Sequence, residues 1–271
     1  MFVNSKWMKD IVRVLGDEAN PPAPREIRRL DKKFFNQTLW ALAEQKKNLD
    51  ASSREWLGFM GFVMSHEKEH FGQLAQDMWV LWETKQKTNG YFVEFGGANG
   101  KFLSNSYLLE HGFGWRGIVA EPNIGFHEEL RANRSCDISP LCVAARTGER
   151  VRFHCTRQGE LSRMAGIESG DRHDRSEYTE IEVETISLDD LLDRHNAPDV
   201  IDYLSIDTEG SEFDILSHRD WTRRRIQLIT VEHNGTDWGP KIFDLLSSVG
   251  YERKFSEFTR FDHWYVLRDD A

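Results

Sequence analysis

The chain has 271 residues, of which 39% are apolar, and its 35 lysines and arginines are outnumbered by 45 aspartates and glutamates. This apolar content argues against a disordered chain, and the acidic balance argues against a nucleic-acid-binding protein, because affinity for phosphates depends on lysine and arginine. Residues 56–64 form the longest mostly apolar run, too short for the ~20 residues of a membrane-spanning helix, and residues 1–10 lack the apolar stretch of a secretory signal. With three cysteines and no CxxC spacing, we expect a cytoplasmic protein that acts on neither nucleic acid nor membrane.

The first 88 residues carry little strand signal and predict a helical N-terminal extension. Helical patterns cover residues 4–15, 23–45 and 53–83, with a proline-rich break at 20–24. We expect this extension to shape the access of a substrate or to form contacts between copies in a homo-oligomer.

Residues 89–271 form the second predicted domain, in which short apolar runs alternate with helical stretches. Strands are expected at residues 91–95, 117–120, 141–145, 201–206, 226–232 and 264–267, and helices at 101–111, 125–133, 188–194, 211–217 and 241–249. This alternation predicts an α/β fold in which a parallel sheet is covered on both faces. The aromatic residues between 255 and 265 predict a terminal antiparallel hairpin, and the polar insertion Arg157–Thr179 predicts a mobile loop.

The strand at 91–95 runs into a glycine-rich turn, Gly96-Gly97-Ala98-Asn99-Gly100. Glycines there permit positive φ and let a ligand approach bare backbone, and the start of a following helix favours an anionic group. Glu121 closes the next predicted strand 21 residues after Gly100, close to the spacing at which an acidic side chain binds a ribose diol. The pattern therefore predicts a ribose-bearing ligand, with an ordinary strand–helix turn as the alternative.

The residues around this turn favour a cationic nucleoside over a dinucleotide. The fingerprint GxGxxG is not met, because Phe95 stands where the first glycine should be. Glu94 would repel a pyrophosphate but suits a ligand that carries an amino group. S-adenosylmethionine has an ammonium, a sulfonium and a ribose, so it fits Glu94 and Glu121 better than a nicotinamide cofactor does.

A second acidic group follows the strand at 201–206. Asp207 and Glu209 share a face at a period of two, and the next strand ends in Glu232 and His233. Ligands of open α/β sheets bind outside the carboxyl ends of the strands, so we expect these four side chains and Glu94 to meet at one rim. Ion pairs and helix caps are the structural alternative for each of them.

The ordered motifs resemble those of the FkbM-type S-adenosylmethionine-dependent methyltransferases, over roughly the last two-thirds of the chain. The similar motifs are Glu94-x-Gly-x-Ala-x-Gly100, Glu121-Pro122-Asn123 and Ile206-Asp-Thr-Glu-Gly-Ser-Glu212. The resemblance implies a class I methyltransferase fold, with a seven-stranded, mostly parallel sheet, and an acceptor that is a hydroxyl of a sugar, a glycan or another small metabolite.

The resemblance also implies roles for individual residues. The turn with Glu94, Gly96, Gly97, Asn99 and Gly100 would hold the methionine part of the cofactor. Glu121 would bind the ribose hydroxyls, Pro122 and Asn123 would lie beside the adenosine, and Asp207 would lie next to the methyl-transfer centre.

Transfer of a methyl group to a hydroxyl requires removal of the hydroxyl proton. We expect Asp207 or His233 to be the base, with Glu209 beside it. A divalent metal such as Mg²⁺, held by Asp207, Glu209 and either Glu232 or His233, is an alternative way to activate the hydroxyl.

Residues 66–70 match the zinc-protease motif HExxH, which places His66 and His70 on one helix face with Glu67 as the base. A zinc hydrolase is therefore a second hypothesis, disfavoured because no third ligand is evident downstream. The same two histidines, together with Gln73 and Asp77, could instead form a polar helix face over the mouth of the site. A non-catalytic binding module with a methyltransferase fold is the third hypothesis.

Overall fold

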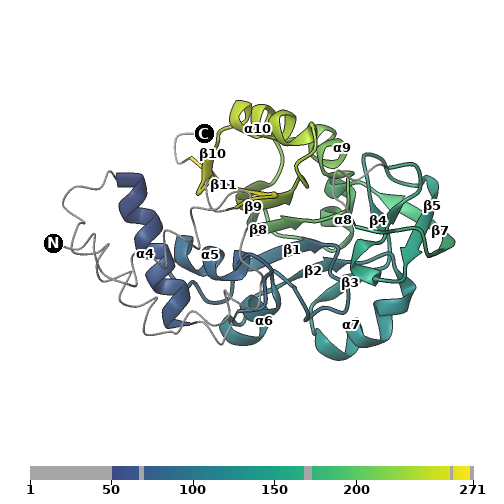
Figure 1. Cartoon of the computed structure of the whole chain (residues 1–271), viewed down its shortest axis with the longest axis horizontal. Helices are drawn as coiled ribbons and strands as arrows, with labels where there is room; N and C mark the ends of the chain where they lie inside the picture. The colour runs from purple at the N-terminus through teal and green to yellow at the C-terminus, as the bar shows by residue number, and fades with distance from the viewer. Residues whose placement is uncertain (1–50, 67–69, 168–172, 257–258, 269–271) are drawn as a thin grey trace, which may run out of the picture. The chain divides into compact units, whose positions relative to one another are not determined.

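The computed structural model describes residues 51–66, 70–167, 173–256 and 259–268, and the chain divides into two compact units, residues 1–65 and 66–271 (Figure 1). The described part of the first unit is the helix α4, Ala51–Ser65. The helices predicted at 4–15 and 23–45 lie outside the described residues. The helix α5, Gln76–Glu83, belongs to the second unit, and a domain boundary between residues 88 and 89 stays a prediction.

The single helix predicted over residues 53–83 is wrong, because the chain leaves the helical conformation between α4 and α5. Ala75, directly before α5, has a left-handed backbone with φ of 63°. The carboxylate of Asp77 accepts hydrogen bonds from the backbone N–H groups of Phe71, at 2.7 Å, and Gly72, at 3.3 Å. These side-chain bonds hold the segment before α5 in a turn and compete with a helix there.

The second unit contains a seven-stranded sheet in the order β10-β11-β9-β8-β1-β2-β3. Its strands are β1 Tyr91–Phe95, β2 Arg116–Ala120, β3 Asp137–Ser139, β8 Val200–Ile206, β9 Arg225–Glu232, β10 Tyr251–Lys254 and β11 Asp262–Leu267. The pairings from β3 through β9 are parallel, while β11 is antiparallel to both β9 and β10. The α/β class is thus confirmed, the sheet is mixed, and the terminal hairpin forms as predicted.

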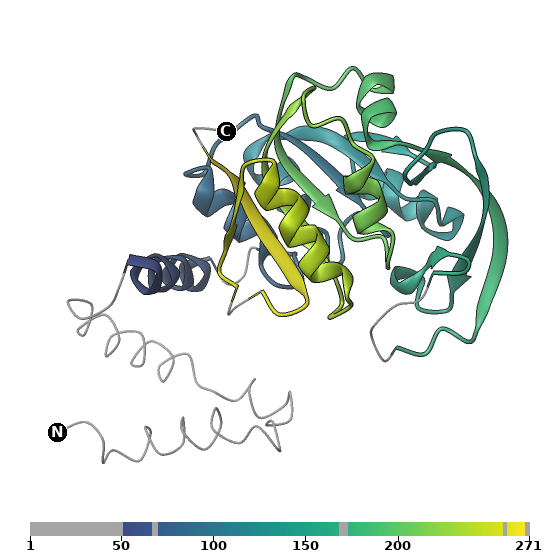
Figure 2. The same ribbon diagram turned by 90° about the horizontal axis from the view of Figure 1, so that it is seen from above.

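Helices cover the sheet because its central strands are apolar on both faces. Every residue of β1 is buried, as are residues 201–206 of β8. One face packs in a single core with the helices α8 Leu188–Arg194, α9 Glu212–Ser217 and α10 Trp238–Ser248, and Figure 2 shows α10 alongside the C-terminal strands. On α5, the Trp79 ring stacks on Trp264 of β11 at 5.1 Å.

Two helices follow β1 and β2 later than their sequences predict. α6 spans Tyr107–Phe113, not 101–111. Its expected first turns are held open by Glu94, whose carboxylate accepts the hydroxyl hydrogen of Ser104 and the N–H of Asn105. The segment predicted at 125–133 divides into a 3₁₀ turn, η2 at Ile124–Phe126, and the helix α7, His127–Asn133.

A second, four-stranded sheet in the order β4-β7-β5-β6 lies at the carboxyl ends of the main strands (Figure 1). Its strands are β4 Cys142–Val143, β5 Arg150–Thr156, β6 Arg163–Met164 and β7 Tyr178–Ile186, and the 3₁₀ turn η3 at Gly159–Leu161 precedes β6. The strand predicted at 141–145 belongs here and not to the main sheet. The insertion predicted as a loop also contains η3 and β6, so that prediction is wrong in part.

The sequence pattern does not predict the second sheet, because the exposed face of this sheet is charged. Arg150 and Arg152 of β5 form diagonal ion pairs with Glu182 and Glu180 of the neighbouring strand β7, at 3.7 and 3.6 Å. Such opposite charges stabilise neighbouring strands but give the sequence the composition of a solvated loop. Within the described ranges, no helix is both long and apolar enough to cross a bilayer.

Candidate functional site

A crevice lies between the main sheet and the second sheet, at the carboxyl ends of β1, β2 and β8. It encloses about 490 Å³ of empty space, its open mouth included. Strand ends of the main sheet contribute Gly96, Glu121, Pro122 and Asp207 to its lining, and the region of the second sheet contributes Phe153, Gly159, Ser162 and Met164.

The glycine turn forms where the sequence predicts it, directly after β1. Gly96 has a φ of 71°, and a side chain there would collide with the backbone carbonyl oxygen of Asp207. A side chain at Gly97 would collide with Val119 of β2. The glycines are therefore required by the close approach of neighbouring strands, and Gly96 also leaves bare backbone at the crevice.

Glu121, which the sequence assigns to a ribose, lines the crevice and joins the turn to the end of β2. Its Oε2 accepts the N–H of Ala98 at 2.8 Å, and its Oε1 accepts the N–H of Asn123 at 2.7 Å. Burial raises the pKa of Glu121 to about 7, despite these two hydrogen bonds. The side chain of Asn123 reaches the second sheet, where its Nδ2 donates to Ser162 at 3.1 Å.

Glu94 is buried but is not among the residues that line the crevice. Its carboxylate accepts hydrogen bonds from the hydroxyls of Ser104 and Ser106 and from the N–H of Asn105, and it lies 3.4 Å from Nη1 of Arg134. Arg134 also pairs with Glu110. Contact between Glu94 and a cationic ligand stays a prediction, while the structure shows Glu94 ordering the loop after the turn.

Asn99 has a local role in the turn. Its Oδ1 accepts the N–H groups of Lys101 and Phe102, and its Nδ2 donates to Glu129 of α7. The side chain of Asn99 thereby fixes the chain that leaves Gly100.

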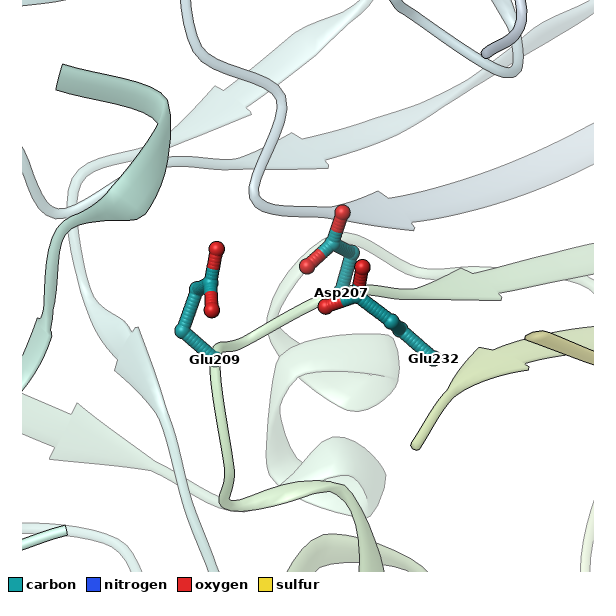
Figure 3. A group of neighbouring side chains, drawn as sticks. All are labelled: Asp207, Glu209 and Glu232. Carbon is teal, nitrogen blue, oxygen red and sulfur yellow. The ribbon is translucent and has the colours of Figure 1, made fainter. Parts of the chain in front are cut away.

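Three acids meet at the ends of β8 and β9, as Figure 3 shows. Asp207, Glu209 and Glu232 each offer a carboxylate oxygen within 4.8 Å of the other two. Asp207 is hydrogen-bonded to Glu232, and its buried Oδ1 accepts no hydrogen bond from an N–H or hydroxyl group. Burial, together with repulsion between these neighbouring carboxylates, raises the pKa of both Asp207 and Glu232, so the pair retains a proton near neutral pH.

Two polar side chains hold this carboxylate cluster (Asp207, Glu209 and Glu232) in place. Nη2 of Arg175, from the connection between β6 and β7, lies 2.6 Å from Oε2 of Glu209. Nδ2 of Asn234 donates to Glu232 at 2.7 Å and lies 3.5 Å from Glu209. Sequence reasoning missed both: Asn234 adjoins the predicted pair at 232 and 233, whereas no local signal marks Arg175.

Strained backbone occurs in these loops, as it does at several other places in the described chain. Ala98, Glu209 and Asn234 have φ values of 45°, 59° and 49°, in the left-handed region that non-glycine residues rarely adopt. Such conformations are typical of functional sites, where the surrounding contacts enforce them.

His233 lies apart from the carboxylate cluster. Successive strand residues point to opposite faces of a sheet, and His233 follows Glu232 directly. Its ring packs on His263 at 4.1 Å, its Nδ1 accepts the N–H of Gly235, and burial lowers its pKa. The structure thus unites three of the five side chains expected at one rim, and Glu94 and His233 are not in that group.

The HExxH segment does not form the expected helix face. α4 ends at Ser65, before the motif, and His70 lies outside any helix. Glu67 lies outside the described residues. Among the residues that the structure describes, the carboxylate cluster is the one set of three potential metal ligands, and it contains no histidine.

Comparisons with known proteins give one family match and one similar solved structure. The family model described as methyltransferase FkbM domain matches residues 94–253, a range that includes Glu121 and the whole carboxylate cluster. No curated protein matches the chain. A solved structure, the precorrin-6y C5,15-methyltransferase of Geobacter metallireducens GS-15, is similar at 12% identity over 74% of this chain and 90% of that chain, with a TM-score of 0.41. Since the family model covers more than half of its residues, the chain belongs to the FkbM methyltransferase family.

Proposed function

We propose that this protein is an S-adenosylmethionine-dependent methyltransferase with the class I fold, and that it methylates a hydroxyl of a sugar or another small metabolite. One observation carries the proposal: Asp207 belongs both to the lining of the crevice and to the carboxylate cluster. A nucleoside held beside Gly96 and Glu121 would therefore have its reactive end close to a group that can accept a proton.

The geometry of Glu121 supports a nucleoside in the crevice. Each of its two oxygens accepts one backbone N–H, and a carboxylate oxygen has two lone pairs. Both oxygens can therefore still accept a hydrogen bond from a ribose hydroxyl. Bound S-adenosylmethionine would supply a methyl group on a positively charged sulfur, whose departure as a neutral thioether drives the transfer.

The remaining task of the protein is to align the acceptor hydroxyl and remove its proton. Asp207 suits this role because its Oδ1 has no partner and faces no competing donor. His233 is the weaker candidate, because its ring is packed on His263 and away from the carboxylate cluster.

Calorimetric titration with S-adenosylhomocysteine tests the proposal. We expect binding to the full chain, and about tenfold weaker binding to Glu121→Gln, because a hydrogen bond to a charged group contributes ~1.5–3 kcal/mol. The exposed Glu149 provides a matched control, and Glu149→Gln should bind like the wild type. Absence of binding to the wild type would refute the proposal, whereas binding without methyl transfer to any of a panel of hydroxyl compounds would favour the non-catalytic module.

A further inference from the structure

We infer that Arg175 is a positioning residue that links the two walls of the crevice. Its effect on methyl transfer rests on the proposed function, but the link between the walls does not. Arg175 lies between β6 and β7, and its side chain is 5% exposed, whereas that of Arg157, which follows β5, is 83% exposed. Because arginine is rarely buried unless it is paired, the burial of Arg175 indicates a defined role.

The guanidinium of Arg175 contacts two separate segments. Its Nη2 donates to Oε2 of Glu209 at 2.6 Å, and its Nε donates to the backbone carbonyl of Leu161 at 3.3 Å. Glu209 follows β8 of the main sheet, whereas Leu161 ends η3 in the region of the second sheet. A planar group with donors on separate nitrogens can hold two such acceptors at a fixed separation.

Both of these segments are walls of the crevice. The lining residues next to Leu161 are Gly159, Glu160 and Ser162, and the lining residues next to Glu209 are Asp207, Thr208 and Ser211. Arg175 therefore joins the wall from the second sheet to the wall that carries Asp207.

The loop that carries Glu209 depends on contacts of this kind. Glu209 has a φ of 59°, and strained conformations persist only where the surrounding contacts enforce them. Glu212 also holds the loop, by accepting the N–H groups of Thr208 and Gly210. Glu212 belongs to the same wall, however, so it fixes the shape of the loop and not its distance from η3.

A change at Glu209 would displace Asp207, which lies two residues before it and beside it in Figure 3. A misplacement of about 1 Å can lower a rate by about 10²-fold. We therefore expect Arg175→Met to lower kcat per nucleoside-binding site by about tenfold or more. Its affinity for S-adenosylhomocysteine should change by less than about threefold, because Glu121 is held by N–H groups of the loops after β1 and β2. A merely structural role would reduce the number of folded sites and leave kcat per site unchanged.

Hydrogen exchange of the full chain, followed by mass spectrometry, tests the link without reference to catalysis. We expect Arg175→Met to raise the exchange rate of both walls, residues 159–162 and 208–211, by about tenfold. The control is Arg157→Met, which removes an exposed pair with Glu177 and should exchange like the wild type in both walls. In Arg175→Lys, a single nitrogen keeps the charge beside Glu209, so residues 208–211 should recover most of their protection and residues 159–162 little of it.

Exchange at the wild-type rate in either wall of Arg175→Met would overturn the inference. If circular dichroism shows that this variant does not fold, Arg175→Lys becomes the test, and wild-type exchange at residues 159–162 would then overturn it. If both walls exchange faster but the wild type does not bind S-adenosylhomocysteine, the link stands and the proposed function fails. If the wild type binds the nucleoside and transfers methyl groups, and Arg175→Met matches it in exchange and in kcat per site, the proposed function stands and the role of Arg175 fails.

Discussion

Glu94 and Asp207 occupy similar places but have opposite surroundings. They lie at or just beyond the ends of the neighbouring strands β1 and β8, and the register pairs Glu94 with Ser205, two residues before Asp207, so both point to the same face. Glu94 is satisfied by two hydroxyls, a backbone N–H and Arg134. Asp207 is crowded by other acids and keeps one oxygen unpartnered. The comparison shows that a buried acid whose oxygens are occupied by hydrogen-bond donors maintains the fold, whereas a buried acid with an unoccupied oxygen is available for chemistry.

The largest expected effect comes from removing the charged partner of Glu94. Arg134→Met leaves the carboxylates of Glu94 and Glu110 buried without their counter-charge, so we expect a loss of ~3–5 kcal/mol in the free energy of unfolding. Urea denaturation measures it. The exposed Arg223, paired with Asp193, is the control, and Arg223→Met should change stability by less than ~1 kcal/mol. Equal losses in the two variants would contradict the comparison.

Asp207→Asn tests whether the acid with the unpartnered oxygen takes part in methyl transfer. Loss of a general base typically costs ~10²–10⁴-fold in rate, so we expect kcat for methyl transfer to fall by about 10²-fold or more, with the affinity for S-adenosylhomocysteine nearly unchanged. Labelled S-adenosylmethionine with an acceptor that the wild type methylates provides the assay. Full turnover by this variant would remove Asp207 from the mechanism, and the same assay on His233→Gln compares the second candidate base.

The pH dependence of stability sharpens the comparison. Burial raises the pKa of Glu232 above its ordinary value of 4.5, so the folded chain keeps a proton that the unfolded chain releases as the pH rises. The stability that Glu232 contributes is therefore present below pH 4.5 and is lost as the pH increases above it. Glu232→Gln removes this penalty, and we expect it to stabilise the protein by ~1–2 kcal/mol at pH 8 and by less at pH 5. Equal effects at the two pH values in urea denaturation would show that Glu232 does not keep its proton.

The sequence pattern predicted the correct bounds of an element where neighbouring residues alone stabilise that element. The strand Tyr91–Phe95 and the helix Leu188–Arg194 have the bounds expected from the sequence, because the first is continuously apolar and the second begins at Ser187, whose hydroxyl accepts the N–H of Asp190. The pattern wrongly predicted a helix at residues 101–106, because Glu94 accepts hydrogen bonds from donors that a helix would have used internally. It also missed the second sheet, because the charged residues that pair across its strands have the composition of a solvated loop.

The sequence by itself determined that this chain alternates strands and helices, that a glycine turn follows the first strand, and that acids end the strands of the proposed nucleoside site. Each of these features depends on residues that are neighbours in the sequence. Only the tertiary structure decided which acids share a site. It paired Glu94 with Arg134, 40 residues away, turned His233 toward His263, and brought Arg175 and Asn234 to the carboxylate cluster. The physical reason is that the burial and charge around an acid come from segments distant in sequence, and these surroundings set whether it is neutralised or left reactive.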